Sequence, residues 1–109
     1  MRGSYFCYMP LHQKISWFKN TLSNEKPDEG WKAPLKALWY DAKGDWHRAH
    51  DLVDGFDGQI AASVHAYLHR KEGDEWNAGY WYRRAGKPFY EGALGDEWEE
   101  LVKECLIRF

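Results

Sequence analysis

Apolar residues recur along this chain at the spacing that places them on one face of an α-helix. The first such stripe has intervals of four, three and four residues and comprises Leu11, Ile15, Phe18 and Leu22. Comparable stripes follow a polar linker at 24–32, and no stretch alternates convincingly between apolar and polar positions. Intervals of three and four match the turn of a helix, whereas strands alternate every two residues. The pattern therefore predicts an all-α fold of about six helices, the first at 10–23 and the last at 96–107.

A glycine–aspartate pair recurs where the predicted helices meet. Two copies, Gly44-Asp45 and Gly73-Asp74, stand in matching stretches offset by 29 residues, and a third copy is Gly95-Asp96. Glycine ends a helix well because it adopts the left-handed backbone conformation without strain. Aspartate begins the next helix well because its carboxylate accepts hydrogen bonds from free backbone N–H groups. Each pair is therefore interpreted as a junction that stops one helix and caps the next.

These junctions set the expected organisation of a single domain at 1–109. An offset of 29 residues is the size of one supersecondary unit, which needs a neighbour to bury its apolar face. Two helical hairpins, each with a glycine–aspartate turn, are expected to fill residues 33–88. The N-terminal helix (10–23) and the C-terminal helix (96–107) are expected to cap the open ends of this pair, because terminal repeats otherwise expose apolar surface.

The hairpins resemble the tetratricopeptide and Sel1-like repeat families. Besides the turn, each hairpin has an alanine a few residues into its second helix, Ala49 and Ala78. The second hairpin ends in Tyr80-Trp81-Tyr82-Arg83-Arg84-Ala85 and then Pro88, which is similar to the end of a Sel1-like unit. The resemblance covers 33–88 and implies a scaffold that binds a peptide or partner protein without catalysis. The offset of 29 residues is shorter than either family's usual repeat, so a helical bundle that reuses the same junction is the alternative.

Charge and composition exclude several classes of protein. The 15 basic and 17 acidic residues give a formal net charge of −2, which argues against a nucleic-acid binder and against a polybasic membrane-surface protein. No window approaches the roughly 20 apolar residues of a membrane span, and no apolar run typical of a signal peptide follows Met1. Cys7 and Cys105 are too few for a disulfide framework, so reduced thiols in a cytoplasmic protein are expected. The oligomeric state is left open.

Four of the five histidines lie within the predicted hairpins, at His47, His50, His65 and His69. The last two are four residues apart on one helix, so both rings project from the same face. The first two are three residues apart on the preceding helix, and antiparallel packing sets the two pairs at similar height. Helical bundles bind divalent metals with such side chains, and His50, His65 and His69 are the candidate metal ligands. No other cofactor is expected. The alternatives are acid–base catalysis and simple packing, with each ring hydrogen-bonded to an acidic or tyrosine side chain.

A second candidate site combines aromatic and basic side chains near the end of the second hairpin. Arg83 and Arg84 follow Tyr80, and Arg70 lies on the preceding helix. Guanidinium groups bind carboxylates and phosphates through paired hydrogen bonds, and arginine beside aromatic rings also suits a peptide groove. The alternative is a basic helix end that matches the helix dipole. The sequence thus favours a peptide- or protein-interaction module. The alternative is a small enzyme or a ligand- or metal-binding protein; no catalytic residue is assigned.

Overall fold

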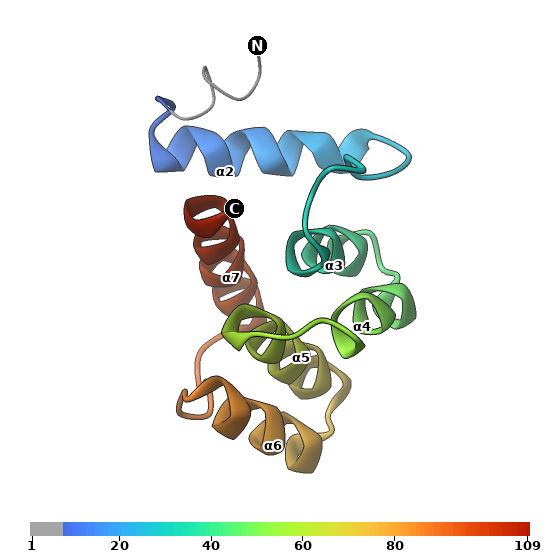
Figure 1. The fold of residues 1–109 in the computed structure, drawn as a ribbon, viewed down its shortest axis with the longest axis vertical. Coiled ribbons are helices and arrows are strands. Elements are labelled where there is room, and N and C mark those ends of the chain that lie inside the picture. Colours follow the sequence, from blue (N-terminus) through green and yellow to red (C-terminus); the bar gives the residue numbers. More distant parts are fainter. Residues whose placement is uncertain (1–7) are drawn as a thin grey trace.

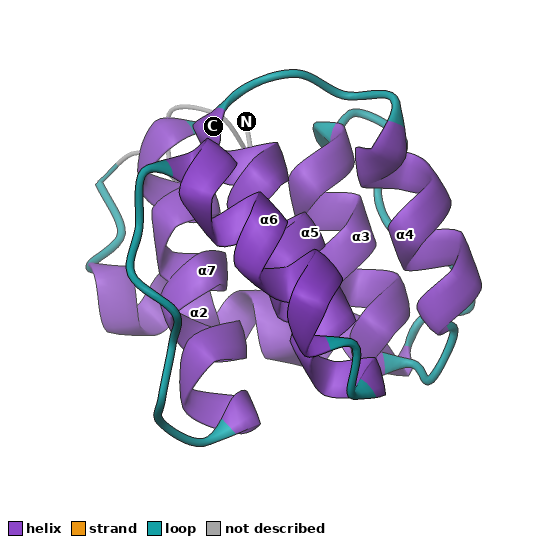
Figure 2. Ribbon diagram, turned by 90° about the horizontal axis from the view of Figure 1, so that it is seen from below, coloured by secondary structure: helices purple, strands orange, loops and turns teal. Residues whose placement is uncertain are grey.

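The computed structural model describes residues 8–109, and all regular elements in this range are helical (Figure 1 and Figure 2). In chain order they are α2 (Leu11–Asn20), the 3₁₀ turn η1 (Thr21–Ser23), α3 (Ala33–Ala42), α4 (Trp46–Asp54), α5 (Gln59–Glu72), α6 (Glu75–Ala85) and α7 (Leu94–Arg108). The predicted all-α fold of about six helices is therefore confirmed.

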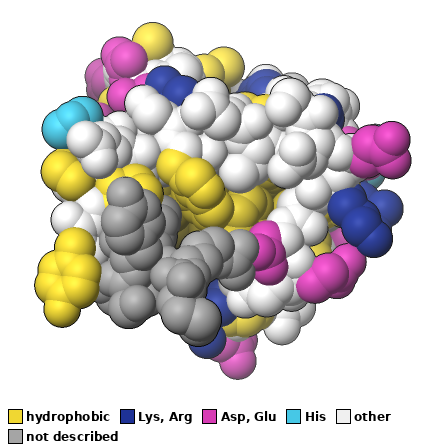
Figure 3. All heavy atoms as spheres, turned by 90° about the horizontal axis from the view of Figure 1, so that it is seen from above, with side chains coloured by type: hydrophobic (Ala, Val, Ile, Leu, Met, Phe, Trp, Pro, Cys, Tyr) yellow, Lys and Arg dark blue, Asp and Glu magenta, His cyan; other side chains and the backbone are white. Residues whose placement is uncertain are grey.

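Helix α5 is the central element of the fold. Helices α3, α4, α6 and α7 all pack against it, and every residue from Ile60 to His69 is buried. Helix α2 lies at one end of the molecule, where it packs against α7, and α6 lies at the other end (Figure 1). Seen from the α2 side, apolar side chains gather at the centre of that face (Figure 3). Because α6 is held chiefly by α5, its opposite face is open to solvent.

The hydrophobic core joins α2, α3, α4, α5 and α7. Its largest fully buried apolar side chains include Phe18, Leu38, Trp39 and Leu68. Burying one such side chain contributes roughly 1.5–3 kcal/mol. Adjacent helices also pack in pairs, α3 with α4 and α5 with α6. Whether these pairs are members of a tetratricopeptide or Sel1-like repeat stays a prediction.

Two of the glycine–aspartate pairs form the expected junctions. Gly44 has φ +88° and Gly73 has φ +89°, both in the left-handed region. The carboxylate of Asp45 accepts a hydrogen bond from the backbone N–H of Arg48 at 3.1 Å. Asp74 accepts the equivalent bond from Asn77, also at 3.1 Å. These two pairs therefore stop one helix and cap the next, as the sequence predicts.

The prediction that the last helix begins at Asp96 is wrong. Helix α7 begins at Leu94 with Ala93 at its N-cap, so Gly95 and Asp96 lie inside its first turn. The left-handed glycine that ends the preceding helix is Gly86, at φ +71°. A loop separates Gly86 from α7, so the third pair has no helix to stop. The first helix also ends earlier than the predicted 10–23 range, because its last three residues form the 3₁₀ turn η1.

Trp76 on α6 is 77% exposed. Helix α6 faces α5 through Ala78, Tyr82 and Ala85, which are buried and recur at intervals of four and three residues. Trp76 precedes Ala78 by two residues, which turns its side chain roughly 200° from that face. The aromatic ring therefore lies on the solvent side of α6.

Two buried carboxylates tie α5 to the helices beside it. Asp41 on α3 accepts hydrogen bonds from the Tyr67 hydroxyl at 2.6 Å and from Lys71 Nζ at 2.8 Å. Glu97 on α7 is the matching group on the other side of α5, where it accepts hydrogen bonds from Arg70 and from the Tyr82 hydroxyl. Since buried charges are tolerated only when they are paired, these contacts fix the arrangement of the three helices.

Residues 8–109 include no membrane-spanning helix and one buried cysteine. Among residues 8–109, no helix combines the length and the apolar character needed to cross a bilayer. Cys105 is a free thiol buried in the core. Cys7 and the segment that follows Met1 lie outside the described residues.

Candidate metal centre

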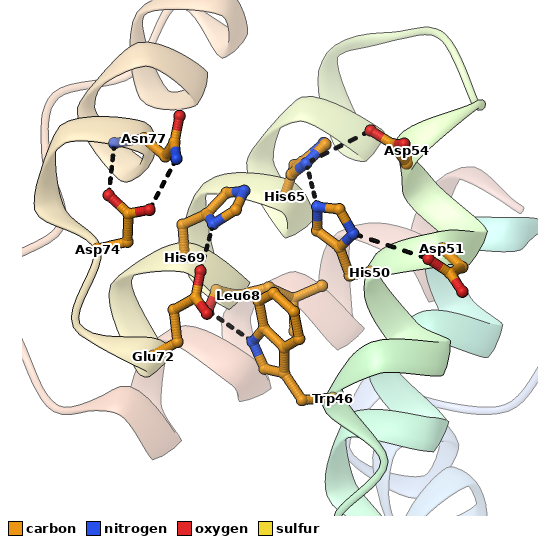
Figure 4. Close-up of polar contacts among 10 residues, drawn as sticks. All are labelled: Trp46, His50, Asp51, Asp54, His65, Leu68, His69, Glu72, Asp74 and Asn77. Carbon is orange, nitrogen blue, oxygen red and sulfur yellow. Dashed lines mark hydrogen bonds and ion pairs between the residues drawn. The ribbon is translucent and has the colours of Figure 1, made fainter.

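Three histidines from two neighbouring helices converge between α4 and α5 (Figure 4). His50 comes from α4, and His65 and His69 come from successive turns of α5. Each offers one ring nitrogen, and the three nitrogens lie within 4.8 Å of one another. The Nε2 atoms of His50 and His65 are 2.9 Å apart, so one donates a hydrogen bond to the other. The structure thus brings together the three residues that the sequence offers as metal ligands.

Aromatic side chains hold two of the imidazole rings in fixed orientations. Trp81 on α6 stacks on His65, with ring centroids 3.8 Å apart and planes at 12°. Trp46 stacks on His50 at 5.0 Å and 10°, and its indole N–H donates to the Leu68 carbonyl at 2.7 Å. Only 2% of His65 is exposed, and 8% of His69. Rings held in this way need little reorganisation to act together.

Acidic side chains surround the three rings. Nδ1 of His69 is 2.7 Å from the Glu72 carboxylate one turn later on α5. If Nδ1–H donates this bond, Nε2 of His69 is left with a free lone pair, as in carboxylate–histidine–metal arrangements. Asp51 is 3.9 Å from Nδ1 of His50, and Asp54 is 3.9 Å from Nε2 of His65. Glu72 therefore orients the His69 ring, and Asp51 and Asp54 add negative charge beside the centre.

Burial keeps His65 neutral at physiological pH. Desolvation is the largest cause that lowers its pKa to about 4, and the nearby His50 and His69 lower it further. The Asp54 carboxylate acts in the opposite direction. A neutral imidazole is the form that binds metals, because its lone pair is not occupied by a proton. The site therefore disfavours the charged form of His65 at neutral pH, and the neutral ring keeps a lone pair with which to bind a metal.

The separation between the Nε2 atoms of His50 and His65 is close to that of two ligands in a metal site. Zinc binds histidine nitrogen at about 2.0–2.1 Å, which puts two ligand nitrogens of a tetrahedral site about 3.3 Å apart. The 2.9 Å separation between His50 and His65 is therefore a few tenths of an ångström short. Three protein ligands also leave one tetrahedral position for water or another ligand.

A second group of potential ligands overlaps with the first. His69, Glu72 and Asp74 also place one atom each within 4.8 Å of one another. Asp74, however, already uses its carboxylate to cap α6 through the backbone and side chain of Asn77. Glu72 is exposed, so a metal there would gain less from a water-excluded site. The three-histidine group is therefore the stronger candidate.

The other sequence-predicted site residues lie elsewhere. His47 is exposed, and its ring stands edge-on to Trp46 at 5.3 Å, outside the cluster. Arg70 donates through Nε to Glu97 at 3.0 Å. Tyr80, Arg83 and Arg84 are exposed on α6. Arg84 donates to the Tyr80 hydroxyl at 3.1 Å, and its guanidinium lies over the Trp81 ring at 5.4 Å.

Sequence reasoning missed the roles of Trp81 and Asp54 beside His65. A signal for Trp81 was present. Helices α5 and α6 run antiparallel about the Gly73-Asp74 junction, so residues whose numbers sum to about 147 lie side by side. This register places position 81 opposite position 66, next to His65. The signal for Asp54 was weaker, because its contact depends on how the turn at 55–58 folds.

Comparisons with protein-family models, with curated proteins and with solved structures find no match to this chain. The fold and the site alone therefore define its class. It is a small all-α protein with a three-histidine group between two adjacent helices.

Proposed function

We propose that the protein binds a divalent transition-metal ion of the zinc class through His50, His65 and His69. The single observation that carries this proposal is the convergence of three ring nitrogens within 4.8 Å, two of them on buried side chains. Imidazole suits zinc, copper, nickel and iron, whereas calcium and magnesium prefer sets of oxygen ligands. The absence of thiolate from this group favours a metal that accepts nitrogen ligands alone.

Binding is expected to stabilise the fold as well as to create a reactive centre. The ligands come from α4 and α5, so a bound ion links these two helices. Zinc at 100 times its dissociation constant would stabilise the native state by about 2.7 kcal/mol. For a domain of this size, that corresponds to a rise in Tm of roughly 10–20 °C. The open fourth position is what a ligand-binding or enzymatic role would use.

The test is zinc binding by purified, untagged protein, measured by calorimetry and metal analysis. We expect about one equivalent of zinc, with binding lost in His65→Ala and in His69→Ala. His47→Ala is the matched control, because His47 lies on the same helix as His50 but outside the cluster. Equal zinc binding by His47→Ala and His65→Ala would contradict the proposal. Circular dichroism of each variant separates loss of binding from loss of fold.

The interaction module favoured by the sequence is a second candidate, supported by one observation. The outer face of α6 exposes Trp76 to 77% and Tyr80 to 37%. Tryptophan and tyrosine are enriched among the residues that dominate protein interfaces. If two copies of the chain meet through this face, sedimentation will depend on concentration, and Trp76→Ser will remove that dependence. A monomer at all concentrations argues against contact between copies.

A further inference from the structure

A cavity of about 620 Å³ lies where the turn between α4 and α5 meets the end of α6. Its lining includes Asp54, Asp57, Trp81, Arg83 and Arg84. These residues come from two stretches that are distant in sequence, the turn that leads from α4 into α5 and the end of α6, so the cavity depends on the packing of α5 against α6. It is large enough for a small organic anion.

The cavity adjoins the three-histidine group through two of its lining residues. Trp81 stacks on His65 at 3.8 Å between ring centroids. The carboxylate of Asp54 is 3.9 Å from Nε2 of His65, the nitrogen that faces His50. Only single side chains thus separate the cavity from a metal held by the histidines. A molecule in the cavity would experience the charge of that metal.

The two arginines in the cavity lining have no acidic partner within residues 8–109. Arg84 makes its polar side-chain contact with the neutral Tyr80 hydroxyl. Arg83 makes no side-chain hydrogen bond or ion pair in the same range. A guanidinium group offers paired N–H donors that match the oxygens of a carboxylate or a phosphate. Both guanidinium groups line the cavity without an acidic partner among the described residues, so their charge is available to an oxyanion bound there.

The first turn of α5 adds further donors to the same cavity. Gly58 is the N-cap of α5 and has no side chain to accept from the first N–H groups of the helix. Gly58 and Gln59 both line the cavity. The positive end of a helix favours an anion, although this feature alone would not make a site.

The charges around the cavity make anion binding depend on the metal. Asp54 and Asp57 offset Arg83 and Arg84, so the lining carries no net formal charge. A divalent ion held by three neutral histidines adds two positive charges beside this lining. At a partly buried site, the electrostatic effect of such an ion on a bound anion exceeds that of exposed side-chain charges, because solvent screens the latter. The cavity is therefore expected to bind an anion tightly only when the metal is present.

We propose that the metal-loaded site takes a small molecule with a phosphate or carboxylate group, which Arg83 and Arg84 hold in this cavity. This inference rests on the proposed metal binding by the three histidines. Metal and anion then favour each other, and each raises the affinity of the other by the same factor.

The test titrates the protein with inorganic phosphate and, in a second arm, with succinate. One equivalent of zinc is present and no free metal. The readout is the indole N–H resonance of Trp81, assigned with Trp81→Phe. We expect saturable shifts in the zinc-loaded protein and at least about tenfold weaker binding without zinc. The arm with the tighter binding identifies the preferred group.

Arg83→Gln and Arg84→Gln are expected to weaken anion binding at least about tenfold, while zinc affinity measured without anion is unchanged. Arg48→Gln is the matched control, because Arg48 is exposed on α4 and lies outside the cavity. Equal anion binding in all three variants, or no saturable shift with zinc bound, would overturn this inference alone. Failure of zinc itself to bind would overturn the metal proposal and this inference together.

Discussion

Replacing Glu97 by glutamine is predicted to destabilise the protein far more than the same change at Glu99. The two glutamates lie two residues apart on α7, and each pairs with one cation. Glu97 accepts from Arg70 at 3.0 Å, and the two side chains are 5% and 16% exposed. Glu99 accepts from Lys19 at 2.7 Å, with the side chains 41% and 48% exposed. Burial, rather than distance, distinguishes the two pairs.

The expected magnitudes follow from this difference in burial. Removing one partner of a buried ion pair costs about 3–5 kcal/mol, because the other charge is left buried without compensation. Removing one partner of an exposed pair costs about 0–1 kcal/mol. Glutamine at position 97 can still accept from the Tyr82 hydroxyl, which lies 2.5 Å from the Glu97 carboxylate. We therefore expect a loss of about 3 kcal/mol for Glu97→Gln and less than about 1 kcal/mol for Glu99→Gln.

Urea denaturation followed by circular dichroism measures both free energies of unfolding. A loss of about 3 kcal/mol is large for a domain whose total stability is about 5–15 kcal/mol. The double variant Arg70→Met with Glu97→Leu is expected to recover much of the loss, because it removes both buried charges. Similar losses for Glu97→Gln and Glu99→Gln would refute the reasoning, since burial would then not decide the cost.

Three further predictions concern single residues. Gly73→Ala is expected to lower the free energy of unfolding in urea by about 1 kcal/mol, because Gly73 has a left-handed backbone. Gly95→Ala is expected to raise it by roughly 0.5 kcal/mol, because Gly95 lies in the first turn of α7. Equal effects of the two changes would contradict this reasoning. In metal-free protein, the lowered pKa of His65, about 4, means that the unfolded chain binds more protons between about pH 4 and 6.5. Stability is therefore expected to fall by on the order of 3 kcal/mol as pH drops through this window, and a pH series that His65→Gln leaves equally steep would argue against it. Burial raises the pKa of Cys105 to about 12, so in a Cys7→Ser variant iodoacetamide should label the protein only after unfolding; rapid labelling of native protein would exclude this.

Local features of the sequence predicted most of the fold. Apolar stripes located the helices because their spacing depends on neighbouring residues alone. The junctions at Gly44 and Gly73 were predictable for the same reason, since a left-handed glycine and a capping aspartate act within one turn. The same motif misled at Gly95, because the distance from the preceding helix decides whether a glycine–aspartate pair ends anything. That distance depends on the loop after Gly86.

The candidate site was only partly predictable. His65 and His69 share a face because they lie on one helix, and antiparallel packing placed His50 near them. His47 lies outside the cluster, because its offset of three positions from His50 turns its ring about 60° away. The rotation of α4 about its own axis is set by packing across the whole core, which no local pattern reports.

The buried polar contacts were not predictable from the sequence. Tyr67 reaches Asp41 across 26 residues, and Arg70 reaches Glu97 across 27. No short motif links residues at such separations. Arg70 was instead expected to bind a ligand or partner. Its pairing with Glu97 shows how a charged residue next to a candidate site can serve the fold.

X-ray absorption at the zinc edge tests the central claim most directly, because it reports the atoms bound to the metal. For protein loaded with one equivalent of zinc, the account predicts three imidazole nitrogens at about 2.0 Å and one further ligand, such as a water oxygen. His47→Ala should give the same spectrum, and His65→Ala should lose the imidazole signal. A shell of oxygen atoms, a sulfur ligand, or an unchanged spectrum in His65→Ala would contradict the account.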